Sequence, residues 1–413
     1  MSDYNPDTFV HPTNEQYIEK LKALNYNLFG RHHLRTWDHS YDDIEAIVVM
    51  ADFIQSLYEQ ERTDAIKLFK GGSAVYEFRD ASTRTKSAFA TSMALVGLGL
   101  YEYDSKKSQA AHGESLIETV NCLSFLCRVY GIRDDIYLGS GETYMEEVIS
   151  ALEYGFSNKF ANRSILDKKP IFINLQSDVD HYTQALSDLM HCVHHFGSLE
   201  NLRGKKFCMS WGYSASYGKP LSVPQGIIGL LTRYGVDMHL AIPSEDFLLL
   251  DNVIEVAEKQ TKESDGKFTI TYDMDSALVD ADIVYVKSWV AQDLARARGE
   301  EYRAGTANLE ELEKIAIERN NNHTDWTLTE ERWALAKPGA IGMHCLPADV
   351  EYKGEVGKDS ANCKKGEWEA PVFAAQRVGM YSEAKNKPFV MAACSLLSAF
   401  EQVPEKIEAN LAK

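Results

Sequence analysis

The feature that most constrains the fold is a regular alternation of short β-branched or aromatic runs with helix-like segments. Such a run recurs about every thirty residues along most of the chain. The predicted strands are residues 74–78, 100–103, 134–139 and 171–175 in the first half, and 206–211, 237–242, 268–272, 282–287 and 340–344 in the second. This rhythm is typical of βαβ units, so the sequence predicts an α/β fold with parallel sheets flanked by helices.

The two groups of strands predict two Rossmann-like lobes. The chain has 413 residues, which suits two or three domains of about 150 residues each. Residues 177–206 are predicted to form a helix that ends at Gly197, followed by a polar turn, and to connect the lobes. We expect a first domain at residues 1–183 and a second at 184–386, with a C-terminal helix in 387–413 that packs on the first. Residues 291–332 lack a strand pattern and are predicted to form a helical excursion.

Composition excludes several classes of protein. Lys and Arg number 43 against 61 Asp and Glu, and the resulting net charge of −18 argues against a nucleic-acid or anionic-membrane binder. The 7 cysteines are scattered without a CxxC pair, which indicates a reducing compartment and neither a disulfide framework nor a cysteine-rich zinc site. The N-terminus lacks an apolar signal segment, and the apolar stretch 389–400 is too short to span a bilayer. We expect a cytoplasmic protein that holds any anionic substrate with a local cationic cluster.

A Ser/Thr-rich turn follows the first predicted strand. The next helix is expected to begin near Thr83, because Phe89, Met93 and Val96 then share one face. N–H groups in the first turn of a helix lack intrahelical partners and favour an anion. The polar side chains of the turn are Ser82, Thr83, Arg84, Thr85 and Lys86. They predict an oxyanion cradle; the alternative is an ordinary N-cap with charges that face solvent.

Polar residues also follow later strands. His181 and Gln184 come just after a buried strand, where α/β sheets place ligands, although helix capping by Asp180 or Thr183 is the alternative. Asp282, Ser288 and Trp289 accompany a further strand and are candidates to hold a second substrate, with packing at the strand end as the default.

His344 and Cys345 end the last strand. Neighbouring strand residues point to opposite faces, so His344 is a poor activator of Cys345, and we expect Cys345 to contact substrate without acting as a nucleophile. His191, His194 and His195 have helical spacing, but a solvated helix face explains them better than a metal site.

These motifs resemble, in content and order, the aspartate/ornithine carbamoyltransferase family. The matching segments are STRT (82–85), GIR (131–133), His181 with Gln184, the strand of 282–289, HCLP (344–347) and QR (376–377), which together cover about residues 70–390. Four longer segments are similar to the knotted branch of that family, and within it to the YgeW-type enzymes of purine-catabolism clusters. They are SQAAHGES, GIRDDIYLGSG, YGKPLSVPQGIIGLLTR and HCLPAD.

The resemblance implies a carbamoyl-phosphate-binding first domain and a second domain for an amino-acid-like substrate. It further implies a trefoil knot in the second domain, a homotrimer with active sites between subunits, and no metal or organic cofactor. The implied ligands of carbamoyl phosphate are Ser82, Thr83, Arg84, Thr85, Arg133, His181, Gln184, Leu346 and Arg377. The implied second-substrate residues are Asn174, Asp282, Ser288, Trp289 and Cys345, and His112 is implied to act in a neighbouring subunit's site. Among these, the catalytic roles fall to Arg133, His181, Thr85 and Cys345.

The sequence departs from the family pattern at positions that concern the second substrate. Lys86 stands where many relatives have Arg, which keeps the charge but loses bidentate geometry, and Tyr182 replaces the usual Pro. Ser288-Trp289 is followed by Val290 and not by the Ser-Met-Gly of ornithine enzymes, which makes ornithine a doubtful acceptor. The segment 220–224 matches one that bounds the amine site in the knotted branch, and this resemblance implies an acylated or ureido substrate.

Three functional hypotheses follow. The first is a carbamoyltransferase that joins carbamoyl phosphate to a small amine, or that phosphorolyses a ureido acid such as 2,3-diureidopropionate. The second is a non-catalytic carbamoyl-phosphate-binding or regulatory subunit. The third, a nicotinamide dehydrogenase, is disfavoured because no G-x-G-x-x-G fingerprint is present.

Overall fold

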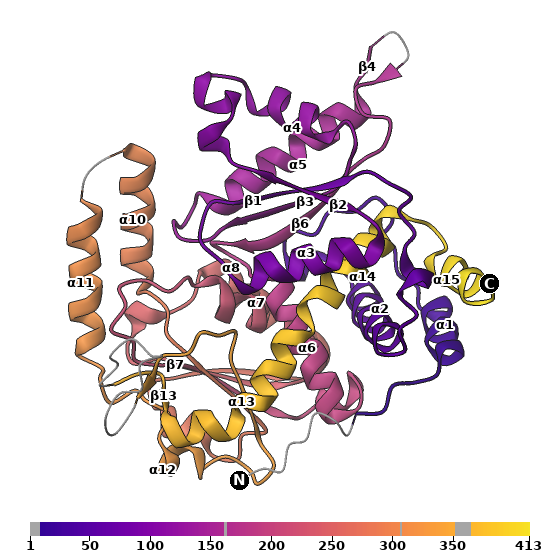
Figure 1. Ribbon diagram of the computed structural model, residues 1–413. Coiled ribbons are helices and arrows are strands. Elements are labelled where there is room, and N and C mark those ends of the chain that lie inside the picture. The colour runs from indigo at the N-terminus through magenta and orange to yellow at the C-terminus, as the bar shows by residue number, and fades with distance from the viewer. Residues whose placement is uncertain (1–8, 161–162, 306–307, 352–364) are drawn as a thin grey trace. The chain divides into compact units, whose positions relative to one another are not determined.

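The computed structural model describes residues 9–160, 163–305, 308–351 and 365–413, which form two compact units (Figure 1). The first unit consists of Val10–Asp135, Ser140–Ser187 and Asn386–Lys413. The second consists of Phe9, Ile136–Gly139 and Asp188–Lys385. The four residues 136–139 thus belong to the second unit although their chain neighbours belong to the first.

A parallel sheet of 4 strands forms the core of the first unit, in the order β2-β1-β3-β6. Its strands are β1 (Ser73–Phe78), β2 (Gly99–Tyr103), β3 (Cys127–Asp134) and β6 (Ile171–Ser177). Every residue of β6 is buried, as expected for a parallel strand that is covered on both faces. Since β2 lies on one side of β1 and β3 on the other, the strand order reverses between β1 and β3.

Helices cover both faces of this sheet (Figure 1). One face carries α4 (Leu116–Ser124) and α5 (Gly141–Ser157), which also pack on each other. The other carries α2 (Tyr41–Glu59), α3 (Arg84–Val96) and α14 (Lys387–Ala399). The unit is completed by α1 (Asn14–Ala23), α15 (Val403–Leu411), the small hairpin of β4 (Lys159–Phe160) and β5 (Arg163–Ser164), and the beginning of α6 (Tyr182–Phe196). The predicted apolar face of α3 is buried, so burial of Phe89, Met93 and Val96 holds this helix on the sheet.

The second unit is built on a parallel sheet of 5 strands in the order β11-β10-β7-β8-β9. Its strands are β7 (Lys206–Trp211), β8 (Asp237–Ala241), β9 (Lys267–Thr271), β10 (Ile283–Lys287) and β11 (Ile341–Met343), and β12 (Val350–Glu351) pairs with β13 (Trp368–Glu369). Its further helices are α7 (Ser222–Leu231), α8 (Asp251–Ser264), α9 (Met274–Leu278), α10 (Gln292–Ala304), α11 (Leu309–Asn321), α12 (Glu330–Trp333) and α13 (Ala370–Lys385). Here the strand order reverses between β7 and β10. In the described part of the chain, no helix combines the length and apolar character needed to cross a bilayer.

The fold confirms the α/β prediction but corrects one strand. The expected strand at residues 134–139 is wrong, because β3 ends at Asp134 and the next residues leave the sheet. Their apolar side chains pack on α10 instead: the rings of Tyr137 and Tyr302 stack with centroids 3.9 Å apart. The other predicted strands are present with ends shifted by at most two residues, and residues 291–332 are helical, as predicted, with no strand among those described. The knot implied by the resemblance stays a prediction.

Candidate active site

The turn between β1 and α3 lies at the carboxyl edge of the first sheet. Helix α3 begins at Arg84 with Thr83 as its N-cap, as predicted. The Thr83 hydroxyl makes no capping hydrogen bond, whereas Ser82 Oγ accepts from the Thr85 N–H at 3.3 Å. The side chains of Thr83 and Arg84 are exposed and that of Thr85 is buried. Lys86 does not complete the cradle as expected, because its ammonium pairs with Glu102 of β2.

Arg133 lies at the end of β3, beside this turn. It is in register with Phe78, the last residue of β1. Its Nη2 donates to Asp135 Oδ2 at 3.1 Å, and the Asp135 N–H donates to Asp80 Oδ2 at 2.9 Å. Burial raises the pKa of Asp135 to about 7, although Arg133 opposes that shift. Asp135, which the sequence analysis missed, therefore links the guanidinium to the β1–α3 turn.

His181 and Gln184 follow β6, the neighbour of β3. His181 immediately precedes α6, and its backbone oxygen accepts from the Gln184 N–H at 3.0 Å. Both side chains are buried. Arg133 pairs in register with Gln176 of β6. The turn, Arg133 and His181 thus follow the carboxyl ends of three neighbouring strands, at the reversal of strand order where open α/β sheets bind ligands.

This edge has the chemistry of a site for an anion with an attached carbonyl group. The N-terminus of α3 offers N–H groups that have no partner within the helix and the positive end of a helix dipole, although Ser82 accepts from the Thr85 N–H. The guanidinium of Arg133, the imidazole of His181 and the carboxamide of Gln184 add donors for a carbonyl oxygen.

A buried carboxylate organises the corresponding edge of the second sheet. Glu367 accepts from Lys219 Nζ at 2.7 Å, the Ser288 N–H at 2.7 Å, the Asp349 N–H at 2.8 Å and the His344 ring at 3.2 Å. Burial raises the pKa of Glu367, but Lys219 and His344 outweigh burial and hold this pKa well below its ordinary range. Glu367 therefore fixes the residues that follow β10 and β11, the two strands that carry the predicted second-substrate residues.

The HCLP segment follows β11 in this unit. Both nitrogens of His344 are engaged, since Nδ1 accepts from the Leu346 N–H at 2.8 Å while Nε2 faces Glu367. Neither nitrogen is therefore directed at the Cys345 thiol, in agreement with the sequence argument. Arg377 is exposed on α13, with its guanidinium carbon 5.9 Å from the centroid of the Phe373 ring.

Two predicted second-substrate residues require correction. Asp282 precedes β10, so it lies at the opposite end of that strand from Ser288, and its carboxylate accepts from Lys337 Nζ at 2.8 Å. Asn174 is fully buried inside the first unit, where Nδ2 donates to the backbone oxygens of Leu34 and Asp180. We assign structural roles to both side chains.

Trp289 and His112 have contrasting environments. Trp289 is fully buried, and its Nε1 donates to the Phe247 oxygen at 2.8 Å. His112 is exposed at the end of the short 3-10 helix Gln109–His112. Its action in a neighbouring subunit stays a prediction.

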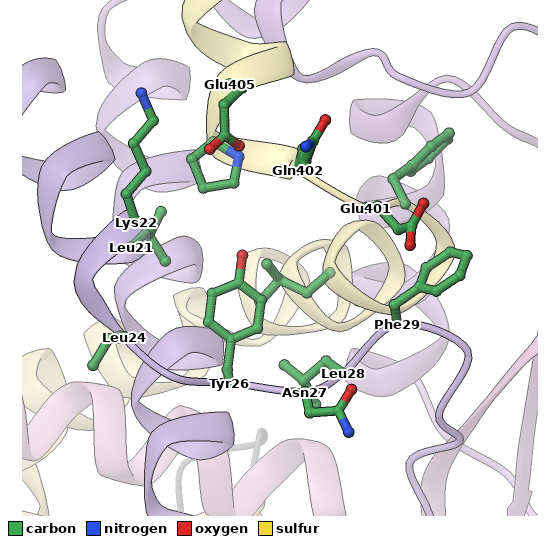
Figure 2. Close-up of a pocket in the computed structure, with 13 residues that line it drawn as sticks. Leu21, Lys22, Leu24, Tyr26, Asn27, Leu28, Phe29, Glu401, Gln402 and Glu405 are labelled. Atoms are coloured by element: carbon green, nitrogen blue, oxygen red, sulfur yellow. The ribbon is translucent and has the colours of Figure 1, made fainter.

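A pocket of about 300 Å³ lies at a different part of the first unit (Figure 2). It is bounded by the end of α1, residues 24–29 and the α14–α15 connection, and Tyr26, Glu401 and Glu405 are among the residues that line it. None of the predicted site residues lines this pocket. Within the described ranges, no group of three or more His, Cys, Asp or Glu side chains is arranged to hold a metal ion.

Family comparisons assign both halves of the chain. The family described as aspartate/ornithine carbamoyltransferase, carbamoyl-P binding domain, matches residues 31–194, and its Asp/Orn binding domain matches residues 221–398. The chain belongs to the aspartate/ornithine carbamoyltransferase family. It is therefore a carbamoyltransferase, and the first sheet edge lies in its carbamoyl-phosphate-binding domain.

Individual relatives agree with this assignment. The Escherichia coli (strain K12) protein named "Putative carbamoyltransferase YgeW" is 42% identical over 386 residues, which are 93% of each chain. Ornithine carbamoyltransferase of Borreliella burgdorferi (strain ZS7) is 28% identical over 334 residues, covering 81% of this chain and 86% of the relative. The structure of acetylornithine transcarbamylase complexed with acetylcitrulline matches with a TM-score of 0.69 at 22% identity, covering 90% of this chain and 100% of that one, and shows the same fold.

Proposed function

We propose that this carbamoyltransferase moves a carbamoyl group between carbamoyl phosphate and the amino group of a small amino-acid-like or ureido compound. The observation that carries the proposal is the shared sheet edge of the β1–α3 turn, Arg133 and His181 in the domain that the family assigns to carbamoyl phosphate. In this proposal Ser82, Thr83 and Arg84 bind the phosphate, while Thr85, Arg133, His181 and Gln184 bind the carbamoyl group.

The proposed reaction needs no side-chain nucleophile. The neutral amine attacks the carbamoyl carbon, and negative charge develops on the carbonyl oxygen. Donors from Thr85, Arg133 and His181 stabilise that charge in place, a contribution of about a hundredfold or more in rate for each donor. The C–O bond to phosphate then breaks, and the phosphate dianion leaves toward the N-terminus of α3 while the amine loses its proton.

We propose that residues of the second unit bind the amine substrate, because the family assigns Asp/Orn binding to that domain. Ser288, Trp289 and Cys345 follow β10 and β11, and Glu367 holds the backbone of Ser288 and the ring of His344 in place. Trp289 is buried, so it contributes shape through packing more than through a direct polar contact. Leu346 and Arg377 are proposed to complete the carbamoyl phosphate site.

The acceptor and direction are the finer parts of the proposal. We propose a ureido acid such as 2,3-diureidopropionate, cleaved by phosphate in purine catabolism, because the sequence resembles the knotted branch of the family and departs from the ornithine pattern after Trp289. The same transition state serves both directions. The test supplies carbamoyl phosphate with a panel of amines and, separately, phosphate with ureido acids, and follows both carbamoyl phosphate and phosphate. Turnover with one class identifies the acceptor, whereas no turnover with any contradicts the proposal.

A non-catalytic carbamoyl-phosphate-binding subunit predicts a different result. Carbamoyl phosphate would raise the melting temperature, but every acceptor would fail. The thermal shift and the turnover assay together separate the two hypotheses.

We also propose that the chain forms a homotrimer in which His112 reaches a neighbouring site. Exposed apolar side chains near the edge strand β2 support a second copy as the partner. They lie on β2, in the first turn of α4 and just after α4, and they are Leu100, Tyr101, Ile117, Phe125 and Leu126. A cytoplasmic location is proposed as well, since the described cysteines are all free thiols.

A further inference from the structure

We propose that the N-terminal segment His33–Thr36 positions His181 by anchoring the residues on both sides of it. In this view His33, Asp180 and Tyr182 are positioning residues. The inference rests on the proposed function, in which His181 donates to the carbamoyl oxygen. All of these residues lie in the first unit.

The first anchor holds Tyr182, the residue after His181. His33 Nδ1 and the Tyr182 hydroxyl are 2.8 Å apart, and His33 Nε2 is 2.8 Å from Ser398 Oγ on α14. All three side chains are fully buried. Burial lowers the pKa of His33 well below its ordinary value, so the ring is neutral, with one nitrogen as donor and the other as acceptor. His33 thus joins the start of α6 to α14 through two hydrogen bonds.

The second anchor holds Asp180, the residue before His181. The Thr36 N–H donates to Asp180 Oδ2 at 2.6 Å, a contact that is fully shielded from water on both sides. Asn174 adds a bridge, because its Nδ2 donates to Leu34 O at 2.8 Å and to Asp180 O at 3.1 Å. Asp180 is therefore tied to the N-terminal segment at its side chain and at its backbone.

The segment itself is fixed to the sheet. The His33 N–H donates to Phe172 O at 2.9 Å, and the Asn174 N–H donates to His33 O at 2.8 Å. These bonds make His33 a parallel bridge partner of Ile173, so the segment extends the sheet beyond β6. An anchor that is part of the sheet can hold a ligand-binding side chain more firmly than a free loop can.

The backbone of His181 is thereby held from both sides. A displacement of about 1 Å in a catalytic group can cost about a hundredfold in rate, so loss of either anchor should lower kcat more than it weakens binding. A purely structural role would instead lower stability and leave kcat unchanged.

The test compares kinetics of matched variants of the full chain. Tyr182→Phe removes only the hydroxyl, and Asp180→Ala removes the acceptor of the Thr36 N–H. We expect each to lower kcat by about 10-fold to 100-fold, with a smaller change in KM for carbamoyl phosphate. Asp180→Asn keeps an acceptor oxygen and should recover most of the kcat that Asp180→Ala loses.

Two further variants control for general effects. Tyr154→Phe removes an exposed hydroxyl on α5 and should leave kcat at the wild-type value. Val148→Ala opens a cavity in the core of the same unit and should lower the melting temperature without lowering kcat. A kcat loss in Val148→Ala equal to that in Tyr182→Phe would overturn the inference.

Hydrogen exchange separates this inference from the proposed function. Amides of residues 180–186 should exchange faster in Tyr182→Phe and Asp180→Ala than in wild type or Val148→Ala, whether or not turnover is detected. Faster exchange in these two variants, together with no turnover by the wild-type chain, would support the anchor and contradict the proposed function. Unchanged exchange together with unchanged kcat would overturn the anchor.

Discussion

Thr85 is a buried hydroxyl in the first turn of α3, at the sheet edge that Arg133 shares. Thr85→Val replaces the hydroxyl with a methyl group of similar size and leaves the helix N-terminus in place. We expect kcat to fall by about a hundredfold or more, because one donor to the developing oxyanion is lost. Steady-state kinetics at saturating substrates measure the effect.

Ser87→Ala serves as the matched control for Thr85. Ser87 lies on the same turn of α3, and its side chain is exposed. Its loss should leave kcat within about twofold of wild type, since surface substitutions away from a site have little effect. Equal losses in the two variants would mean that helix stability, and not the Thr85 donor, sets the rate.

Asp180 makes the free energy of unfolding depend on pH. Burial raises the pKa of Asp180 to about 7 from an ordinary value of 3.8, while the hydrogen bond from Thr36 opposes the shift. Between about pH 4 and 7 the folded chain then holds a proton that the unfolded chain has released. The free energy of unfolding must therefore fall as pH rises through this window and level off above it.

Asp180→Asn cannot titrate and removes this dependence. From pH 5 to pH 8 the unfolding free energy of the variant should gain roughly 2 to 3 kcal/mol relative to wild type. Urea unfolding across this pH range measures the difference. Parallel pH profiles for the two proteins would contradict the raised pKa.

The sequence could locate local motifs, such as the start of α3 near Thr83, but it could not identify distant partners. The STRT turn could be found because strand, hydroxyls and helix start are adjacent in the chain. Glu367 carries no local signal, because its partners Lys219, Ser288 and His344 come from three other segments. His33 lies 149 residues before Tyr182, and no sequence period connects them.

At the scale of elements, α10 makes a close approach that explains why residues 136–139 leave the sheet. Gly299 of α10 would, with a Cβ, place that atom 2.1 Å from Leu138 O. Arg303 of the same helix donates to Leu138 O at 2.7 Å. The sequence shows that residues 136–139 are partly apolar, but it does not show that they pack on α10, which lies far along the chain. The predicted strand 134–139 therefore begins where β3 ends.

Gly299→Ala tests the close packing of α10 against Leu138. Alanine favours a helix interior by about 1 kcal/mol over glycine, so helix propensity alone predicts a more stable protein. The contact with Leu138 predicts the opposite, a net loss of about 1 to 3 kcal/mol from overpacking. Thermal unfolding decides between them, with Glu300→Ala at an exposed position of α10 as the control. A higher melting temperature for Gly299→Ala would contradict the close packing.

At the scale of the whole molecule, each sheet has predicted site residues at the carboxyl ends of strands beside its reversal of strand order: the β1–α3 turn and Arg133 in the first sheet, Ser288 and Trp289 in the second. The sequence rhythm predicted both sheets, because parallel strands with crossover helices repeat at a regular spacing. It could not predict strand order, which depends on packing between elements. The order β2-β1-β3-β6 is what brings the turn after β1 next to Arg133 on β3.

The proposed trimer makes a prediction about mixed assemblies. His112→Ala and Arg133→Gln should each be nearly inactive alone. If His112 of one subunit serves the Arg133 site of another, refolding an equal mixture should restore roughly a quarter of wild-type activity, because that share of sites contains both intact residues. Light scattering confirms the oligomeric state. Activity of the mixture no greater than the mean of the two variants would contradict action between subunits.

The most direct test of the central claim is a crystal structure with carbamoyl phosphate bound. The account predicts phosphate at the N-terminus of α3, within hydrogen-bond distance of Ser82 and Thr83, and the carbamoyl oxygen within reach of Arg133 and His181. Density for the ligand elsewhere, with this turn unoccupied or His181 directed away from the carbamoyl group, would contradict the account.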